Sequence, residues 1–194
     1  MSVFKEVINT PSSNVYYYQD ILPDDLIPDF DKLWNLHPIK YHTIYYKGRA
    51  VETPRWQQAY GKSYSYSGNV NMALEIPELL QSILDWSNNN DTDSSNPFNM
   101  ILINWYLDGT HSIAPHSDDT RQLVDQSSIW CFSFGQIRKF TLENKQTLEK
   151  TNINLENNSL ITMNDNTQGE YRHSIPKTKK DIGKRISITL RKFK

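Results

Sequence analysis

The chain has 194 residues, about the length of one domain, and 37% of them are apolar and 12% aromatic, a content that excludes an intrinsically disordered protein. Its one cysteine, Cys131, excludes a disulfide framework within the monomer and is expected to be a buried structural thiol. There is no run of about 18 apolar residues, and residues 1–20 lack the pattern of a secretory signal. We therefore expect a soluble intracellular protein, in the cytoplasm or the nucleus.

The net charge of −1 is unevenly distributed along the chain. Residues 172–194 carry nine lysines and arginines against one acid, Asp181. A basic segment of this kind suits contact with nucleic acid phosphates. It suits equally well an edge strand that lysines protect from aggregation. Charge alone leaves both interpretations open.

Two amphipathic helices are predicted in the first half of the chain. Residues 24–36 place apolar side chains at helical spacing, with Pro28 tolerable only near a first turn. Residues 75–87 repeat the pattern, with Pro77 in the first turn. Between them, residues 41–68 interleave aromatic and basic side chains, which suits either a surface that stacks bases and holds phosphates or a tyrosine-rich hairpin covering a sheet.

A polar loop at residues 88–96 separates this mixed half from a strand-rich half. Five segments there are short, alternating or β-branched, and end at turn residues: 100–107, 128–134, 138–143, 159–163 and 185–193. Such a series predicts a sandwich or jelly roll. We expect a mainly β fold with flanking helices (α+β) in one domain over residues 1–194, with residues 97–194 as its β core and residues 1–96 as helices and a lid.

Three residues in the second half have the spacing of a metal site. His116 and Asp118 are two positions apart, so in an extended chain their side chains point to one face with Cα atoms about 6.6 Å apart. His173 supplies a distant second imidazole. Two histidines and one carboxylate are the ligands that hold non-haem Fe(II) and leave coordination positions open. We predict these three residues as the metal ligands and the catalytic centre.

The last predicted strand carries two arginines on one face. That face consists of Arg185, Ser187, Thr189 and Arg191. An arginine fork binds a carboxylate bidentately and keeps its charge, so the pair is predicted to clamp a dicarboxylate. Asn104 and Tyr106, also two positions apart on a predicted strand, can present an amide and a phenol to the same ligand.

The motifs around these residues carry a family resemblance. They are Ile101 to Gly109, His116 to Asp119, Ser133 to Gly135, Met163-Asn164, His173 to Pro176 and Arg185 to Arg191. In order and spacing they resemble the AlkB family of Fe(II)- and 2-oxoglutarate-dependent dioxygenases, especially its eukaryotic-type nucleic acid repair branch. The resemblance covers residues 100–194 strongly and reaches more loosely back to about residue 45.

The resemblance implies a double-stranded β-helix, a form of jelly roll, with an N-terminal extension that recognises nucleotides. It implies Fe(II) on the predicted triad, 2-oxoglutarate as cosubstrate and O2. Arg185 and Tyr106 would bind the distal carboxylate of 2-oxoglutarate, and Asn104 and Arg191 would lie toward its metal-chelating end, with Ser187 nearby. The implied activity is oxidative demethylation of bases such as 1-methyladenine and 3-methylcytosine in DNA or RNA, by a monomer that binds no membrane.

The resemblance also points to residues on the substrate side. They are Tyr46, Arg55, Tyr64, Tyr66, Asp119, Thr120 and Arg138. Tyr64 and Tyr66 would line the base pocket, and Tyr45 and Tyr46 would lie near a hairpin that probes the duplex. Candidate phosphate contacts are Arg121, Arg138 and the lysines at 177, 179 and 180.

Two positions depart from the family pattern. Thr120 stands where repair enzymes commonly place an acid, and a hydroxyl is a weaker, neutral acceptor for an exocyclic amine. Ser187 stands where asparagine is common. Two alternatives therefore stay open: a dioxygenase that acts on a protein or a small molecule, and a catalytically silent jelly-roll binding module.

Overall fold

The computed structural model describes residues 4–46, 48–66 and 69–194, and the side chains of Tyr46, Ser65, Tyr66 and Asn69 lie outside this description. Its largest element is an eight-stranded sheet. The strand order is β1 (Phe4–Asn9), β2 (Asn14–Tyr18), β14 (Ser159–Asn164), β11 (Ser128–Gly135), β16 (Arg185–Arg191), β9 (Met100–Tyr106), β5 (Trp56–Tyr60) and β8 (Ala73–Leu74). Only β5 and β8 are paired in parallel.

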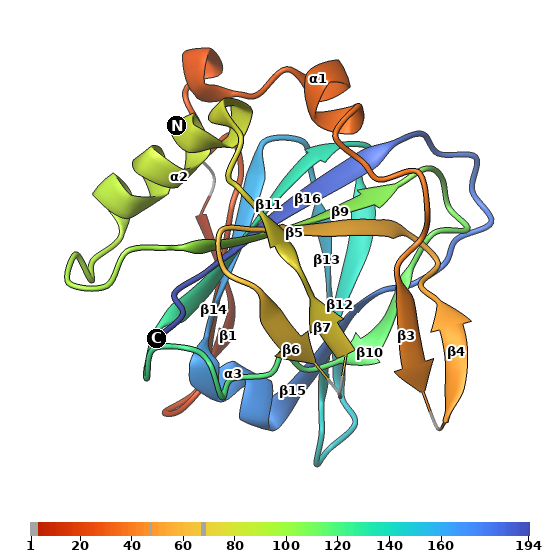
Figure 1. Cartoon of the computed structure of the whole chain (residues 1–194). Helices are drawn as coiled ribbons and strands as arrows, with labels where there is room; N and C mark the ends of the chain where they lie inside the picture. The colour runs from red at the N-terminus through yellow and green to blue at the C-terminus, as the bar shows by residue number, and fades with distance from the viewer. Residues whose placement is uncertain (1–3, 47, 67–68) are drawn as a thin grey trace.

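A second sheet of four strands faces the first. Its order is β10 (Ile113–His116), β15 (Tyr171–Ile175), β12 (Arg138–Asn144) and β13 (Lys150–Leu155). Two short ribbons complete the β structure: β3 (Thr43–Tyr46) with β4 (Arg49–Glu52), and β6 (Tyr64–Tyr66) with β7 (Asn69–Asn71). Figure 1 shows both ribbons below β5, at the same end as β10. The predicted jelly roll is confirmed.

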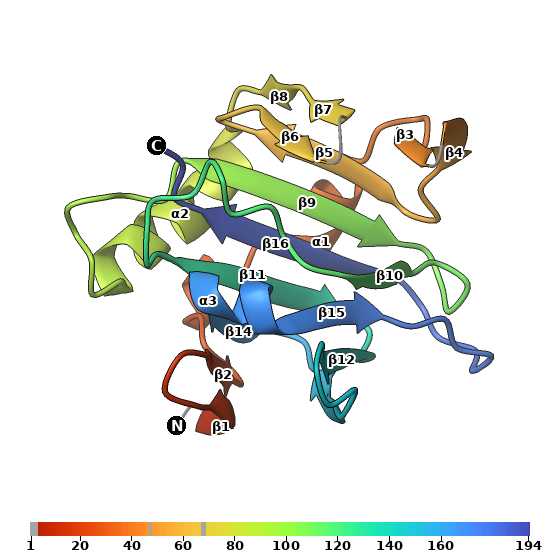
Figure 2. The ribbon, with the colours of Figure 1, turned by 90° about the horizontal axis from the view of Figure 1, so that it is seen from below.

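Three helical segments cover the face of the large sheet that is turned away from the small sheet: η1 (Asp24–Leu26), α1 (Phe30–Trp34) and α2 (Glu78–Asn90). A fourth, α3 (Asp165–Glu170), lies between β14 and β15 along the chain. In Figure 2, β10 and β15 lie in front of the large sheet and α1 and α2 behind it. No helix in the described part of the chain is long and apolar enough to cross a membrane.

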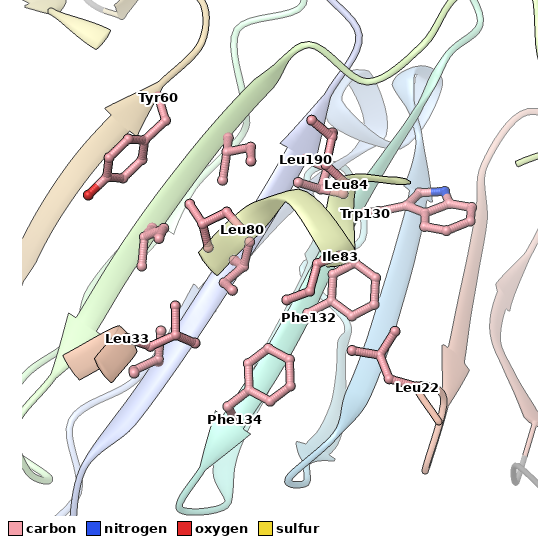
Figure 3. Close-up of a cluster of buried hydrophobic side chains, with 14 of the residues drawn as sticks. Leu22, Leu33, Tyr60, Leu80, Ile83, Leu84, Trp130, Phe132, Phe134 and Leu190 are labelled. Carbon is pink, nitrogen blue, oxygen red and sulfur yellow. The ribbon is translucent and has the colours of Figure 1, made fainter. Parts of the chain in front are cut away.

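The core has two parts, one on each face of the large sheet. Ile101, Ile103 and Trp105 of β9 pack against α1 and α2, together with the isoleucines of β16. Figure 3 shows this cluster, with Leu80, Ile83 and Leu84 of α2 over Phe132, Phe134 and Leu190 of the sheet. Met100, Leu102 and Tyr106 of β9 belong to the second cluster, between the sheets. Period-two alternation along one strand thus supplies both cores.

The helix predicted over residues 24–36 is wrong as a continuous element. The structure has a single 3-10 turn, then an extended stretch at Ile27, and a short helix that begins after Asp29. Pro28 disfavours the helical conformation in the residue before it, which separates the two pieces. Asp29 caps the second piece, since its carboxylate accepts a hydrogen bond of 3.0 Å from the Lys32 backbone N–H.

The second predicted helix is confirmed but displaced toward the C-terminus. Pro77 is its N-cap, with an extended ψ of 152°, so the helix begins at Glu78. At the other end it takes in Asn88 to Asn90, which we expected in a loop. The five predicted strands are all present. Sequence reasoning missed β1, β2, β5, β7, β8, β10, β13 and β15, and with β15 the strand that carries His173. Because β1, β2, β5 and β8 belong to the large sheet, the division into helices and a lid over residues 1–96 and a β core over residues 97–194 is wrong.

We predict that Leu80→Ala lowers the free energy of unfolding by about 2–5 kcal/mol, because Leu80 is fully buried between α2 and the sheet and its loss leaves a cavity. The measurement is chemical denaturation. The matched control is Leu74→Ala, at a side chain that is 56% exposed, which should change stability by less than about 0.5 kcal/mol. Equal losses for both variants would contradict this picture of the core.

Candidate active site

A cavity of about 450 Å³ lies between the two sheets and contains almost all of the predicted chemistry. Its wall includes the predicted metal ligands, the polar face of β16, and the side chains of Asn104 and Tyr106 on β9. The apolar residues that alternate with them lie in the core behind the sheet. As predicted from the sequence, Arg185, Ser187, Thr189 and Arg191 therefore lie on one face of β16, and this face lines the cavity.

His116, Asp118 and His173 converge at this cavity. One ligand atom from each lies within 4.8 Å of the others. The convergence follows from strand pairing, because His116 at the end of β10 lies opposite His173 on β15. Asp118 follows β10 and is held by a 2.9 Å hydrogen bond from its backbone N–H to the side-chain oxygen of Gln168 on α3. The donor set fits Fe(II) with positions left open for other ligands.

Both imidazoles are prepared to act as ligands. The Nδ1 atom of His116 lies 2.9 Å from the backbone oxygen of Ala114, and because a carbonyl only accepts, Nδ1 carries the proton and Nε2 keeps its lone pair. Burial lowers the pKa of His116. Burial and the neighbouring His116 lower the pKa of His173 to about 3. Both rings are therefore neutral at neutral pH, as metal ligation requires.

Arg191 orients the carboxylate of the triad. Its Nη2 and Nε atoms donate to Oδ2 of Asp118 over 2.5 and 3.2 Å, which leaves Oδ1 near both imidazoles, at 3.6 Å from His116 and 3.9 Å from His173. Burial alone would raise the pKa of Asp118, but the charge of Arg191 and its hydrogen bond hold that pKa well below the usual range. The carboxylate is thus ionised and aimed before any metal binds.

Arg185 is prepared for an anion. It is only 1% exposed, and its Nη2 donates to the Ser133 hydroxyl over 2.8 Å. Its Nε and Nη1 have no hydrogen-bond partner among the described residues. The guanidinium carbon lies 5.0 Å from the ring centre of Tyr106. A buried charge with unpaired donors is costly unless a ligand completes it, and a carboxylate matches this fork. The residues present thus fit a dicarboxylate cosubstrate.

Arg138 has a different role from the one predicted, and its guanidinium carbon lies 5.6 Å from the ring centre of Tyr106. It is 2% exposed, and its guanidinium donates to the backbone oxygens of Asp108, His111 and Pro176 over 2.8–3.0 Å. It therefore ties together the loop after β9 and the loop after β15. With its donors directed inward, it is not available as the phosphate contact that we expected.

Arg55 begins a chain of amide side chains along the cavity wall. Its Nε donates to Oδ1 of Asn104 over 2.7 Å, and its Nη2 donates to Oε1 of Gln57 over 3.0 Å. Gln57 in turn donates from Nε2 to Oδ1 of Asn71 over 2.7 Å. All four side chains are buried and line the cavity. Sequence reasoning missed Gln57 and Asn71, because their meeting depends on pairing between separate strands.

The other substrate-side predictions have mixed outcomes. Tyr64 lines the cavity, with the guanidinium of Arg191 5.8 Å from its ring centre. Asp119 also lines it and is paired with Arg121. Thr120 is exposed and is not part of the wall. The side chains of Tyr46 and Tyr66 lie outside the described residues, and lysines 177, 179 and 180 are exposed.

Two side chains differ in their surroundings from what the sequence suggested. Cys131 is only partly buried and lines the cavity, where the Thr189 hydroxyl lies 3.5 Å from its sulfur. Burial raises the pKa of its thiol. His111, in a stretch that the sequence marks as a polar loop, is buried outside the metal site, and its Nε2 lies 3.1 Å from the Tyr41 hydroxyl.

The chain is similar to enzymes of known family. The sequence model of the 2OG-Fe(II) oxygenase superfamily matches residues 26–191. The DNA oxidative demethylase ALKBH2 of Bos taurus is 32% identical over 157 residues, which are 75% of this chain and 55% of that protein. The human ALKBH2 is also 32% identical over 157 residues, 75% of this chain and 59% of that protein. This chain thus spans little more than half the length of these relatives.

Two further comparisons agree with these. The alpha-ketoglutarate-dependent dioxygenase alkB homolog 3 of Mus musculus is 29% identical over 148 residues, 71% of this chain and 51% of that protein. The solved structure of OsALKBH1 superposes with a TM-score of 0.61 at 15% identity, covering 95% of this chain and 99% of that one, and it supports the fold alone. Together with the His-Asp-His site, the match over residues 26–191 means that the chain belongs to the 2OG-Fe(II) oxygenase superfamily, as an AlkB-like Fe(II)- and 2-oxoglutarate-dependent dioxygenase.

Proposed function

We propose that this protein removes N-methyl groups by oxidation from bases such as 1-methyladenine and 3-methylcytosine in DNA or RNA. The observation that carries the proposal is the convergence of His116, Asp118 and His173 beside the unpaired donors of Arg185 in one cavity. Relatives that match three quarters of the chain are named DNA oxidative demethylases. That name is the reason to prefer a methylated base over other substrates of the superfamily.

Each residue of the cavity has a task in this proposal. His116, Asp118 and His173 would hold Fe(II), and Arg185 with Tyr106 would hold the distal carboxylate of 2-oxoglutarate. Asn104 and Ser187 lie opposite each other on β9 and β16, and Asn104 would lie toward the metal-chelating end of the cosubstrate. When bound, Fe(II) and 2-oxoglutarate supply the activation of O2 that oxidises a methyl group. Arg191 keeps the Asp118 carboxylate ionised and in place.

The substrate base must leave its stack to reach this cavity, so the enzyme acts on single strands or flips the base. The Tyr64 ring, at the cavity wall, is proposed to stack on it. A second hollow, of about 360 Å³, lies across β10 and shares Ser112 to Pro115 with the cavity wall. Lys139, Lys150 and Lys177 line it, which supports a path for a phosphate backbone beside the site.

The first prediction tests the reaction. We expect the protein, incubated with Fe(II), 2-oxoglutarate and oligonucleotides that contain 1-methyladenine or 3-methylcytosine, to lower the mass of each oligonucleotide by that of one methylene group. It should also release succinate. His116→Ala should abolish both signals because the triad loses a ligand. Succinate release with unchanged oligonucleotides would reject the repair function and favour a protein or small-molecule substrate for the same chemistry.

The second prediction concerns the cosubstrate. Arg185→Lys removes the guanidinium, whose Nε and Nη1 have no partner among the described residues and are proposed to bind a carboxylate. The affinity for 2-oxoglutarate, measured by isothermal titration calorimetry, should therefore fall about 10- to 100-fold. Arg172→Lys is the matched control, since Arg172 pairs with Glu143 outside the cavity. If Arg185→Lys binds 2-oxoglutarate with unchanged affinity, Arg185 does not bind the cosubstrate.

The third prediction concerns Arg191, which touches the carboxylate ligand rather than the metal. Arg191→Met frees Asp118 to rotate, and loss of such a supporting contact typically weakens metal affinity about 10- to 100-fold. Titration with Co(II), followed by its visible absorption, measures this directly. If Arg191→Met binds Co(II) as tightly as the unaltered protein, the ion pair does not orient the ligand.

A further inference from the structure

The chain of amides that starts at Arg55 has only one possible direction. A guanidinium has donors and no acceptor, so the Gln57 atom 3.0 Å from Arg55 must be the amide oxygen. The amide nitrogen of Gln57 then points to Asn71, 2.7 Å away, and Asn71 must receive it with its own oxygen. Asn71 is left with its NH₂ group at the end of the chain.

This NH₂ group belongs to the wall of the cavity. Asn71 lines the same cavity as the predicted metal ligands and is only 7% exposed. No hydrogen bond from its nitrogen to another described residue is present. On the β6–β7 ribbon it lies directly opposite Tyr64, the residue proposed to stack on the base. A base lying on Tyr64 would thus have a fixed hydrogen-bond donor close to one of its edges.

The acceptors of the cavity wall are mostly engaged or remote. Three carboxylates line it among the described residues: Glu52, Asp118 and Asp119. Asp118 is a predicted metal ligand held by Arg191, and Asp119 is held by Arg121 through both oxygens. Glu52 is exposed on β4, and Thr120 is not part of the wall. The buried part of the wall opposite Tyr64 therefore offers a donor, the NH₂ group of Asn71.

A donor at this place selects among methylated bases by simple complementarity. At C4 of the pyrimidine or C6 of the purine, 3-methylthymine, 3-methyluracil and 1-methylguanine carry a carbonyl oxygen, which accepts. In 1-methyladenine and 3-methylcytosine the same place is taken by an exocyclic nitrogen, which donates, and the ring is cationic. A donor that faces a donor leaves both groups unpaired, which disfavours an exocyclic NH₂ group beside the NH₂ of Asn71.

We propose that Asn71 donates a hydrogen bond to the oxygen at C4 of a methylated pyrimidine or C6 of a methylated purine, so that the enzyme prefers 3-methylthymine, 3-methyluracil and 1-methylguanine over 3-methylcytosine and 1-methyladenine. This rests on the proposed demethylase function and orders its substrates. Arg55 and Gln57 are positioning residues in this scheme, because they fix which end of the Asn71 amide faces the base.

The test compares two single-stranded oligonucleotides that are identical except for one 3-methylthymine or one 3-methylcytosine. The quantity measured is the ratio of kcat/KM for 3-methylthymine to that for 3-methylcytosine, which should exceed one in the unaltered protein. Asn71→Asp keeps the acceptor for Gln57 and replaces the NH₂ by an oxygen, so the ratio should fall by about tenfold or more.

A second variant changes the same polarity without altering Asn71. In Gln57→Glu, both side-chain oxygens only accept, so Asn71 must turn its NH₂ toward residue 57 and its oxygen toward the base. The ratio should fall in this variant as well. The matched control is Gln58→Glu, because Gln58 is bonded to the backbone oxygens of Ala59 and Met72 and is not part of the cavity wall. Its ratio should stay as in the unaltered protein.

The outcomes distinguish failure of the demethylase function from failure of the base preference. If neither oligonucleotide is demethylated although 2-oxoglutarate is consumed, the demethylase function fails and the preference with it. If both are demethylated but 3-methylcytosine reacts faster, the function stands and the reading by Asn71 is overturned. An unchanged ratio in whichever of Asn71→Asp and Gln57→Glu remains folded, judged by circular dichroism, also overturns it.

Discussion

Strand β16 is hydrogen-bonded to β11 on one side and to β9 on the other, and the register of these two pairings determines the site. It sets Arg185 opposite Tyr106 and Ser187 opposite both Asn104 and Ser133. Because side chains alternate along a strand, the same register sends Ile186, Ile188 and Leu190 into the core under the helices. A slip of one residue would place arginines in that core, so apolar packing holds the polar face in place.

The polar face concentrates charge where a folded protein usually avoids it. Arg55, Arg138, Arg185, Arg191 and Asp118 all line or adjoin one cavity, and the four arginines are each less than 9% exposed. Arg138 is satisfied by three carbonyls and Arg191 by a carboxylate, whereas Arg185 keeps two unpaired donors. The contrast separates structural arginines from the one poised for a ligand, since an unpaired buried donor is expensive.

The sequence was sufficient for those parts of the site that depend on local spacing. The alternating face of β16 follows from a period of two within one strand, and the two-residue spacing of His116 and Asp118 carries the first two ligands even though Asp118 lies beyond the end of β10. The helix over residues 24–36 failed because Pro28 outweighed a good apolar pattern. The structural role of Arg138 and the hydrogen bond between Gln57 and Asn71 were not predictable from the sequence. Both depend on which loops and strands come together in the fold.

The ion pair between Asp118 and Arg191 also bears on how the protein exchanges protons when it takes up metal. Binding of a metal to acidic and imidazole ligands commonly releases protons, which makes affinity rise with pH. Here the low pKa of Asp118 and the lowered pKa values of both histidines mean that all three ligands have already lost their protons near neutrality. Uptake of Fe(II) near neutrality would therefore not require a proton to leave any of the three ligands.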